Sequence, residues 1–190
     1  MHRRISGLVV GTAVATLAAF APMASATVLN FDDIGSSGFV PASYGGLDWS
    51  ASSWLAFDGE QAPYTPHSGS WRVATEFGSV DAASAIRFAT PSVFNGAWFS
   101  GYDDSSVGFL LYLGGALVAT SNTLSTSITP TFLASGYTGL ADAVVVTSGQ
   151  QAFYAMDDFT FNEVPEPGTW TLTFAGLGIV AAVARRRRKV

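Results

Sequence analysis

The chain has 190 residues, of which 12% are charged, against about 25% in an average soluble domain. Residues 27–163 hold 13 acidic residues, two arginines and no lysine, and the other seven basic residues lie near the two ends. A segment with a net charge of −11 excludes phosphate-backbone binding, so nucleic acid is not an expected partner. The absence of cysteine excludes thiol nucleophiles, thiolate metal sites and disulfides.

Residues 1–26 have the parts of a secretory signal peptide. Two arginines form a charged start, an apolar run follows, and Ala24 and Ala26 supply the small-x-small cleavage pattern. The sequence therefore predicts cleavage after Ala26 and a mature protein that begins at Thr27, outside the cytoplasm. An uncleaved N-terminal anchor is the alternative, but the apolar run is short and a cleavage pattern follows it.

The domain at 27–162 has short apolar runs between segments rich in Gly, Ser and Thr, and no window shows helical spacing over ten or more positions. This pattern predicts an all-β fold, and many short strands between turns favour a jelly-roll-like two-sheet β-sandwich. Gly114 and Gly115 predict a hairpin turn, because glycine adopts positive φ readily. The expected strands are 28–31, 47–50, 71–75, 85–89, 97–101, 107–113, 116–121, 130–133, 143–147 and 153–161.

Two segments that bracket the domain carry a family resemblance. Val-Leu-Asn-Phe-Asp-Asp at 28–33 and Phe-Tyr-Ala-Met-Asp-Asp-Phe at 153–159, with Trp49 and its upstream Tyr-Gly-Gly-Leu, resemble small secreted domains of the galactose-binding-like jelly-roll type. The resemblance covers about a quarter of the domain. It implies the fold rather than an activity.

Three Asp-Asp pairs, at 32–33, 103–104 and 157–158, are candidate metal ligands. Adjacent strand residues point to opposite faces, so each pair is expected to offer one carboxylate to the core side. The pair at 103–104 follows Gly-Tyr and precedes Ser-Ser, which indicates an exposed turn.

Asp157 has the same parity as the apolar residues of the last strand (Phe153, Ala155, Phe159 and Phe161). An unpaired carboxylate on an apolar face is costly, so Asp157 needs Arg87, backbone N–H groups or a cation. If the first and last strands are neighbours, Asp33 is expected to lie beside Asp157. Two hypotheses stay open: a structural Ca²⁺ held by Asp33 and Asp157 with loop carbonyls, or a carboxylate bound by amides or Arg87. No other cofactor is expected.

Catalytic machinery is hard to assemble from this sequence, and no enzyme is expected. His67 is the one imidazole of the mature domain and lies in a turn, Pro-His-Ser-Gly. Ser68 or Ser70 would need His67 as a base, a geometry that neighbours in a turn rarely reach. Neither Gly-x-Ser-x-Gly nor His-Glu-x-x-His is present. A secreted hydrolase of polysaccharides or esters that uses His67 is the alternative.

Aromatic residues near loops are candidates for contact with a glycan, because sugar rings present apolar C–H faces. Trp54, Tyr64 and Tyr102 have such positions, whereas Trp71 and Trp98 lie inside strand patterns and are expected in the core. The alternative for all of them is packing within the domain, since aromatic residues are favoured in strands.

The C-terminal segment from residue 163 has three features in a fixed order. A Pro-Glu-Pro motif comes first, followed by an apolar stretch at 169–184 and a basic tail. This stretch of 16 residues is at the short limit for a transmembrane helix, and the basic tail orients its end toward the cytoplasm. The motif residues are Val164, Pro165, Glu166 and Pro167, and the tail residues are Arg185, Arg186, Arg187, Arg188 and Lys189.

These three features together resemble the PEP-CTERM sorting signal of Gram-negative, exopolysaccharide-producing bacteria. The resemblance implies that a membrane enzyme, exosortase, recognises the motif, removes the tail and passes the protein outward. The alternative is a permanently anchored single-pass membrane protein. Both begin with the domain in the periplasm and the helix in the inner membrane.

The sequence thus predicts a non-enzymatic protein of the cell envelope or exopolysaccharide matrix. Its β domain is expected to have a structural or glycan-adhesive role at the cell surface or in the extracellular matrix. The expected partners are exosortase, the membrane and exopolysaccharide.

Overall fold

The computed structural model describes residues 26–75, 85–149 and 153–163, together with 173–174, 176–181 and 184–185 near the C-terminus. The described domain is built almost wholly of β-strands, as predicted, with one short 3₁₀ turn, η1 (Tyr44–Gly46). The strands are β1 (Ala26–Leu29), β2 (Gly38–Phe39), β3 (Leu47–Asp48), β4 (Trp54–Phe57), β5 (Arg72–Thr75), β6 (Ala85–Gly101), β7 (Ser106–Leu113), β8 (Ala116–Thr120), β9 (Leu124–Ser125), β10 (Thr131–Ala134), β11 (Ala141–Ser148) and β12 (Tyr154–Asn162).

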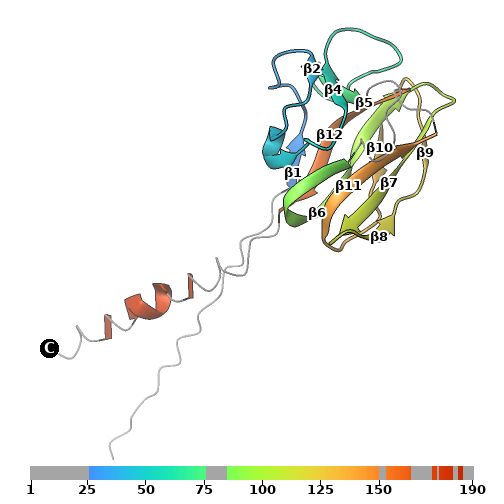
Figure 1. Ribbon diagram of the computed structural model, residues 1–190. Coiled ribbons are helices and arrows are strands. Elements are labelled where there is room, and N and C mark those ends of the chain that lie inside the picture. Colours follow the sequence, from blue (N-terminus) through green and yellow to red (C-terminus); the bar gives the residue numbers. More distant parts are fainter. Residues whose placement is uncertain are drawn as a thin grey trace, which may run out of the picture.

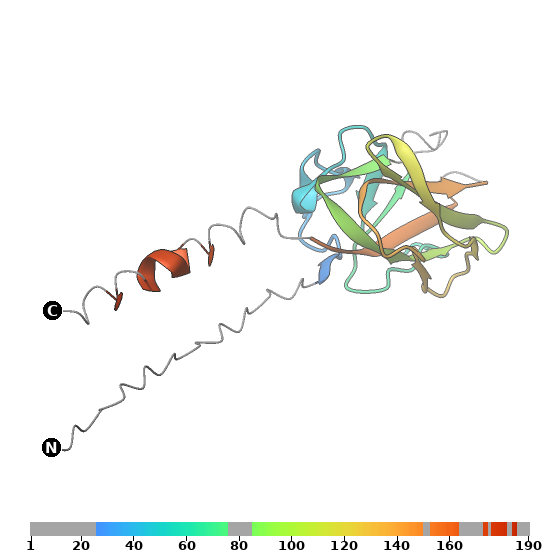
Figure 2. The same ribbon diagram turned by 90° about the horizontal axis from the view of Figure 1, so that it is seen from below.

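The strands form one large antiparallel sheet that wraps around a common centre (Figures 1 and 2). Its hydrogen-bonded order is β2-β4-β5-β12-β6-β11-β7-β8, and the short strands β1, β3, β9 and β10 pair beside this path. The first and last strands are neighbours, because Ala26 pairs with Asn162 and Leu29 with Phe159. The predicted Gly114-Gly115 turn joins β7 to β8, and both glycines have positive φ.

Strand β6 connects the two halves of the sheet. The residues up to Ser92 pair with β3 and β11, and those from Val93 onward pair with β10 and β12. The sequence predicts two separate strands here, at 85–89 and 97–101; the structure shows one continuous strand. Pro91 lies beside the change of partners, where a missing N–H is tolerated. At Gly96 a side chain would collide with the backbone of β10.

Aromatic side chains from both halves of the sheet form the core. Phe94 and Phe109 make an edge-to-face pair with ring centroids 4.8 Å apart, and Phe88 lies 5.3 Å from Phe161. Each pair joins a ring from the half of the sheet with β10 and β12 (Phe94, Phe161) to a ring from the half with β3, β11 and β7 (Phe109, Phe88). The buried faces of the two halves therefore meet. Burying large aromatic rings supplies much of the folding free energy.

A bulge in β12 overturns the predicted alternation of that strand. The register shifts between Asp157 and Thr160, and Asp158 has a positive φ of 46°. Tyr154 and Met156 point into the core before the bulge, and Phe159 and Phe161 point into it afterwards. Asp157 therefore alternates with buried Met156 and does not share the apolar face of the phenylalanines. An extra residue in a strand has this effect because side-chain direction repeats every two residues.

The two ends of the chain lie mainly outside the described residues. This holds for the predicted signal peptide apart from Ala26, for the Val-Pro-Glu-Pro motif at 164–167, and for the tail beyond Arg185. The predicted membrane helix at 169–184 is described in part, and these residues are helical. Within the described parts of the chain, no helix is both long and apolar enough to span a bilayer.

Candidate functional site

The loop between β4 and β5 brings together most of the predicted polar candidates. It runs over residues 58–71 and is rich in glycine, proline and serine, which favour turns over regular structure. Such a loop has few apolar side chains of its own to hold it on the domain. Its position is instead set by carboxylates from two other parts of the chain.

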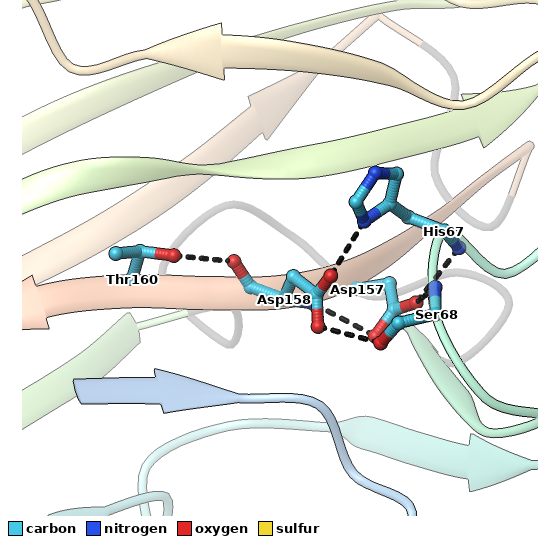
Figure 3. Close-up of polar contacts among 5 residues, drawn as sticks. All are labelled: His67, Ser68, Asp157, Asp158 and Thr160. Carbon is cyan, nitrogen blue, oxygen red and sulfur yellow. Dashed lines mark hydrogen bonds and ion pairs between the residues drawn. The ribbon is translucent and has the colours of Figure 1, made fainter. Parts of the chain in front are cut away.

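Asp157 binds the backbone of this loop (Figure 3). Its Oδ2 accepts hydrogen bonds from the N–H groups of His67 at 2.8 Å and Ser68 at 2.9 Å, and its Oδ1 accepts one from the N–H of Asp158 at 2.7 Å. The side chain is only 3% exposed. Burial raises the pKa of Asp157 to about 6, although the hydrogen bonds from Ser68, Asp158 and His67 oppose that rise. Of the partners considered for this carboxylate, backbone N–H groups are the ones the structure provides.

Asp158 binds side chains of the same loop residues. Its Oδ2 lies 2.5 Å from Nδ1 of His67, and its Oδ1 accepts a hydrogen bond from the hydroxyl of Ser68 at 2.8 Å. Both carboxylates of this pair thus face one loop, which corrects the expectation of opposite faces. The β12 bulge is the cause, because the positive φ of Asp158 turns its side chain toward the loop.

Asp32 provides the third anchor. Its Oδ1 accepts hydrogen bonds from the N–H groups of Ser70 at 2.9 Å and Trp71 at 3.2 Å. Its neighbour Asp33 points elsewhere and accepts a hydrogen bond from the hydroxyl of Tyr44 at 2.6 Å. Burial raises the pKa of Tyr44, and this hydrogen bond raises it further. We call Asp32, Asp157 and Asp158 the carboxylate clamp.

The two residues predicted to bind calcium are thus engaged separately. Asp33 binds Tyr44, and Asp157 binds the loop backbone. The chain turns at Phe31, whose φ is +60°, so the alternation that would have aligned Asp33 with Asp157 stops there. Across residues 26–75, 85–149 and 153–163, no three His, Asp or Glu side chains converge as a metal site would require.

The His67 ring is held on both sides. It stacks on Trp98 with ring centroids 3.4 Å apart and planes 12° apart, and its Nδ1 contacts Asp158. Trp98, expected in the core, is instead half-buried on the outer face of β6, where it also lies 5.7 Å from Phe132. The Ser68 hydroxyl donates to Asp158 and not to His67. This arrangement holds the turn at His67 and Ser68 against β12.

The residues of the anchored loop line a cleft of about 430 Å³. The cleft is lined by Gly59, Glu60, Gln61, Ala62, Tyr64, Thr65, Pro66, Gly69 and Ser70. A second hollow of about 350 Å³ adjoins it at Ala62 and includes Tyr102, Asp103 and Ile128. Ligand sites of 300 to 1,000 Å³ with a few polar groups on mostly apolar walls are typical of proteins.

Tyr64 and Tyr102 stand where the two hollows meet. Their rings form an edge-to-face pair 5.8 Å apart, and this pair continues to Phe57 on one side and Phe153 on the other. Tyr102 is 44% exposed, and Tyr64 is half-buried. Burial raises the pKa of Tyr64, and the neighbouring Tyr102 raises it further.

Trp54, the third predicted glycan contact, is not at this surface. It lies in β4, is 1% exposed and packs edge-to-face against Tyr154 at 6.1 Å. The four-residue strand Trp-Leu-Ala-Phe alternates inward and outward, and Trp54 and Ala56 point inward. The prediction for Trp54 was therefore wrong, and the packing alternative holds for it.

The fold and the site define a class of protein: a β-rich domain with an anchored surface loop and an aromatic cleft, joined to a short C-terminal signal. Residues 163–189 match the model of the PEP-CTERM protein-sorting motif, which confirms the sorting signal. The chain is accordingly an exported, cell-envelope-sorted protein, and its motif implies processing by exosortase. No curated protein matches the sequence.

Proposed function

We propose that the β domain is a glycan-adhesive module that the sorting signal delivers to the cell surface or exopolysaccharide matrix. The Tyr64–Tyr102 pair at the junction of the two hollows is the observation that carries this proposal. Exposed aromatic rings stack on the apolar faces of sugars, and the adjoining Glu60, Gln61 and Asp103 supply acceptors and donors for sugar hydroxyls.

The carboxylate clamp supports this role because it fixes the cleft before any ligand arrives. Asp32, Asp157 and Asp158 together accept hydrogen bonds from His67, Ser68, Ser70 and Trp71. The cleft-lining residues Gly69 and Ser70 lie within this anchored stretch. A preformed site avoids the entropy cost of ordering a loop on binding.

We further propose that the sheet is a two-layer sandwich of the jelly-roll type. Its support is the aromatic contact between β6 and β7 and between β6 and β12, which brings the buried faces of the two halves together. Such a fold presents loops at its ends and outer faces, where the cleft lies.

Binding of the producer's own polysaccharide by purified residues 27–163 tests the adhesive role. We expect the Tyr102→Ala variant to bind about fivefold more weakly, since one stacking contact contributes about 1 kcal/mol. Phe39→Ala removes another exposed aromatic side chain, 63% exposed and outside both hollows, and should bind normally. Equal binding by the two variants would contradict the proposal.

A non-enzymatic role is part of the proposal, and the same incubation separates it from the hydrolase alternative. Retention of intact polysaccharide supports adhesion. Release of fragments that disappears in the His67→Ala variant would instead establish a hydrolase.

Removal of the tail, as opposed to permanent anchoring, is tested by the mass of the mature protein from its producer. We expect the wild type to lack residues 168–190 and the Glu166→Ala variant to retain them. If both retain the tail, the protein is a single-pass anchor.

A further inference from the structure

A second hollow site lies on the outer face of the other half of the sheet. Across strands β6, β11 and β7, Ala143 pairs with Arg87 on one side and with Tyr112 on the other. Neighbouring strands are about 4.8 Å apart, so Arg87 and Tyr112 stand roughly 10 Å apart with one methyl group between them. Long side chains on both sides of an alanine leave a notch across the sheet.

The floor of this notch extends along the strands. In the next row, Val145 pairs with Ala85 and with Leu110. The core residues Val144 and Val146 alternate with these positions, so the floor faces away from the core. Together they form a hollow of about 460 Å³, large enough for one or two sugar rings.

Arg87 is an exposed cation at the edge of this hollow. Residues 27–163 contain two arginines, and the other one, Arg72, is buried under the 58–71 loop, with its guanidinium 4.4 Å from the ring of Phe57. Arg87 is exposed, and within the described parts of the chain its guanidinium makes no hydrogen bond or ion pair. Asp48, its cross-strand neighbour in β3, accepts a hydrogen bond from Ser50, which lowers the pKa of Asp48, and the nearby charge of Arg87 lowers it further.

Asp142 supplies an acceptor on the opposite rim. Its Oδ2 accepts a hydrogen bond from the N–H of Gly114 at 2.6 Å, which fixes the Gly114-Gly115 turn as the end wall of the hollow. The hollow thus combines an apolar floor, a cation, a phenol and a carboxylate. A cation and an acceptor on opposite rims match a ligand that has both a carboxylate and hydroxyl groups.

We propose that this hollow binds a saccharide unit that carries a carboxylate, of the hexuronate type. The Arg87 guanidinium pairs with the carboxylate through two parallel N–H···O bonds. The ring lies over Ala143 beside Tyr112, and a ring hydroxyl donates to Asp142. The domain's net charge of −11 disfavours a dense polyanion, so the ligand is a mostly neutral glycan with isolated acidic units. This site shares no lining residue with the Tyr64 cleft and is independent of it.

The test compares two tetrasaccharides that differ in one unit, glucuronate in one and glucose in the other. Calorimetric titration uses the protein without the predicted signal peptide, residues 27–190, in a mild non-ionic detergent. We expect the acidic tetrasaccharide to bind at least tenfold more tightly than the neutral one. Arg87→Gln should abolish this preference, and Arg87→Lys should restore only part of it, because lysine keeps the charge but loses the fork geometry.

Tyr102→Ala is the matched control, and it should leave the preference for the acidic tetrasaccharide unchanged even if it weakens polysaccharide binding. Equal binding of the two tetrasaccharides, or no binding of either, overturns the proposal. A preference that survives in Arg87→Gln overturns it too. Melting curves of both Arg87 variants establish that they are folded, and we expect no change at this exposed position.

Discussion

Replacing Asp157 by asparagine should remove a specific pH dependence of folding. The native carboxyl has a pKa of about 6, raised from the ordinary value of 3.8 chiefly by burial. Between those two values the folded state holds a proton on Asp157 that the unfolded state has released. The linkage relation then states that the free energy of unfolding falls as the pH rises through this interval.

The size of the effect follows from the same two values. Each pKa unit corresponds to about 1.4 kcal/mol, so Asp157 stabilises the fold below pH 3.8 by about 3 kcal/mol relative to pH 7. This contribution is lost as the pH rises through about 6. The amide that replaces the carboxyl cannot titrate, so the Asp157→Asn variant should lack the slope. The variant should also be less stable by the same amount at every pH, because its NH₂ group faces one of the three backbone donors.

Urea unfolding followed by tryptophan fluorescence at pH 4, 5, 6 and 7 measures this difference. We expect the free energy of unfolding of the variant, relative to that of the wild type, to rise by about 2–3 kcal/mol between pH 4 and pH 7. Asp104→Asn, in an exposed turn, is the control, and its difference from the wild type should stay flat. If the difference in unfolding free energy between Asp157→Asn and the wild type depended on pH as little as that of Asp104→Asn, the reasoning would be refuted.

Three further predictions concern the clamp, the core and metal ions. Gly69→Ala should lower stability by about 2 kcal/mol, because Gly69 has a φ of +52° and the added methyl group would collide with Asp32. Gly59→Ala introduces only the backbone strain and should lose less stability. Trp54→Ala should cost about 3–5 kcal/mol, whereas the exposed Phe39→Ala should stay within about 0.5 kcal/mol. A chelator should leave the melting temperature unchanged, because Asp33 and Asp157 already have hydrogen-bond partners.

Thermal melting of the same proteins could contradict each of these three predictions. Equal losses for Gly69→Ala and Gly59→Ala would mean that the Asp32 contact is not tight. A Trp54→Ala protein as stable as Phe39→Ala would mean that the side chain is not buried. A melting temperature lowered by several degrees in the chelator would establish a structural ion.

The sorting motif and the strand-rich character could both be predicted from the sequence because each depends on local patterns. Pro-Glu-Pro, an apolar stretch and a basic tail are contiguous. Alternating short apolar runs with turn residues between them indicate strands whatever their partners are. The hypothesis that Asp33 approaches Asp157 required the first and last strands to be neighbours; that pairing is present, but Asp33 binds Tyr44 instead.

The carboxylate clamp could not be predicted, because it depends on a bulge. Strict alternation assigns Asp157 to the face of Phe159, and only the register shift between them reverses this. Nothing in a single sequence marks that shift. The loop residues His67 and Ser68 lie about 90 positions away from their partners, a distance over which local patterns carry no information.

Trp54 and Trp98 illustrate the same limit in the prediction of which side chains are buried. Trp54 follows a run of serine and alanine that is typical of a loop, yet four residues with two inward positions are enough for an interior strand. Trp98 lies on a strand, but its neighbours Ala97 and Phe99 take the inward face and leave it to stack on His67. Strand membership alone does not decide which face a residue occupies.

The pairing of β1 with β12 has a topological consequence for export. Ala26 and Asn162 are direct cross-strand partners, so the predicted signal peptide and the sorting signal are attached to the domain at adjacent points. The domain can therefore close the β1–β12 ladder while both segments are still attached to it.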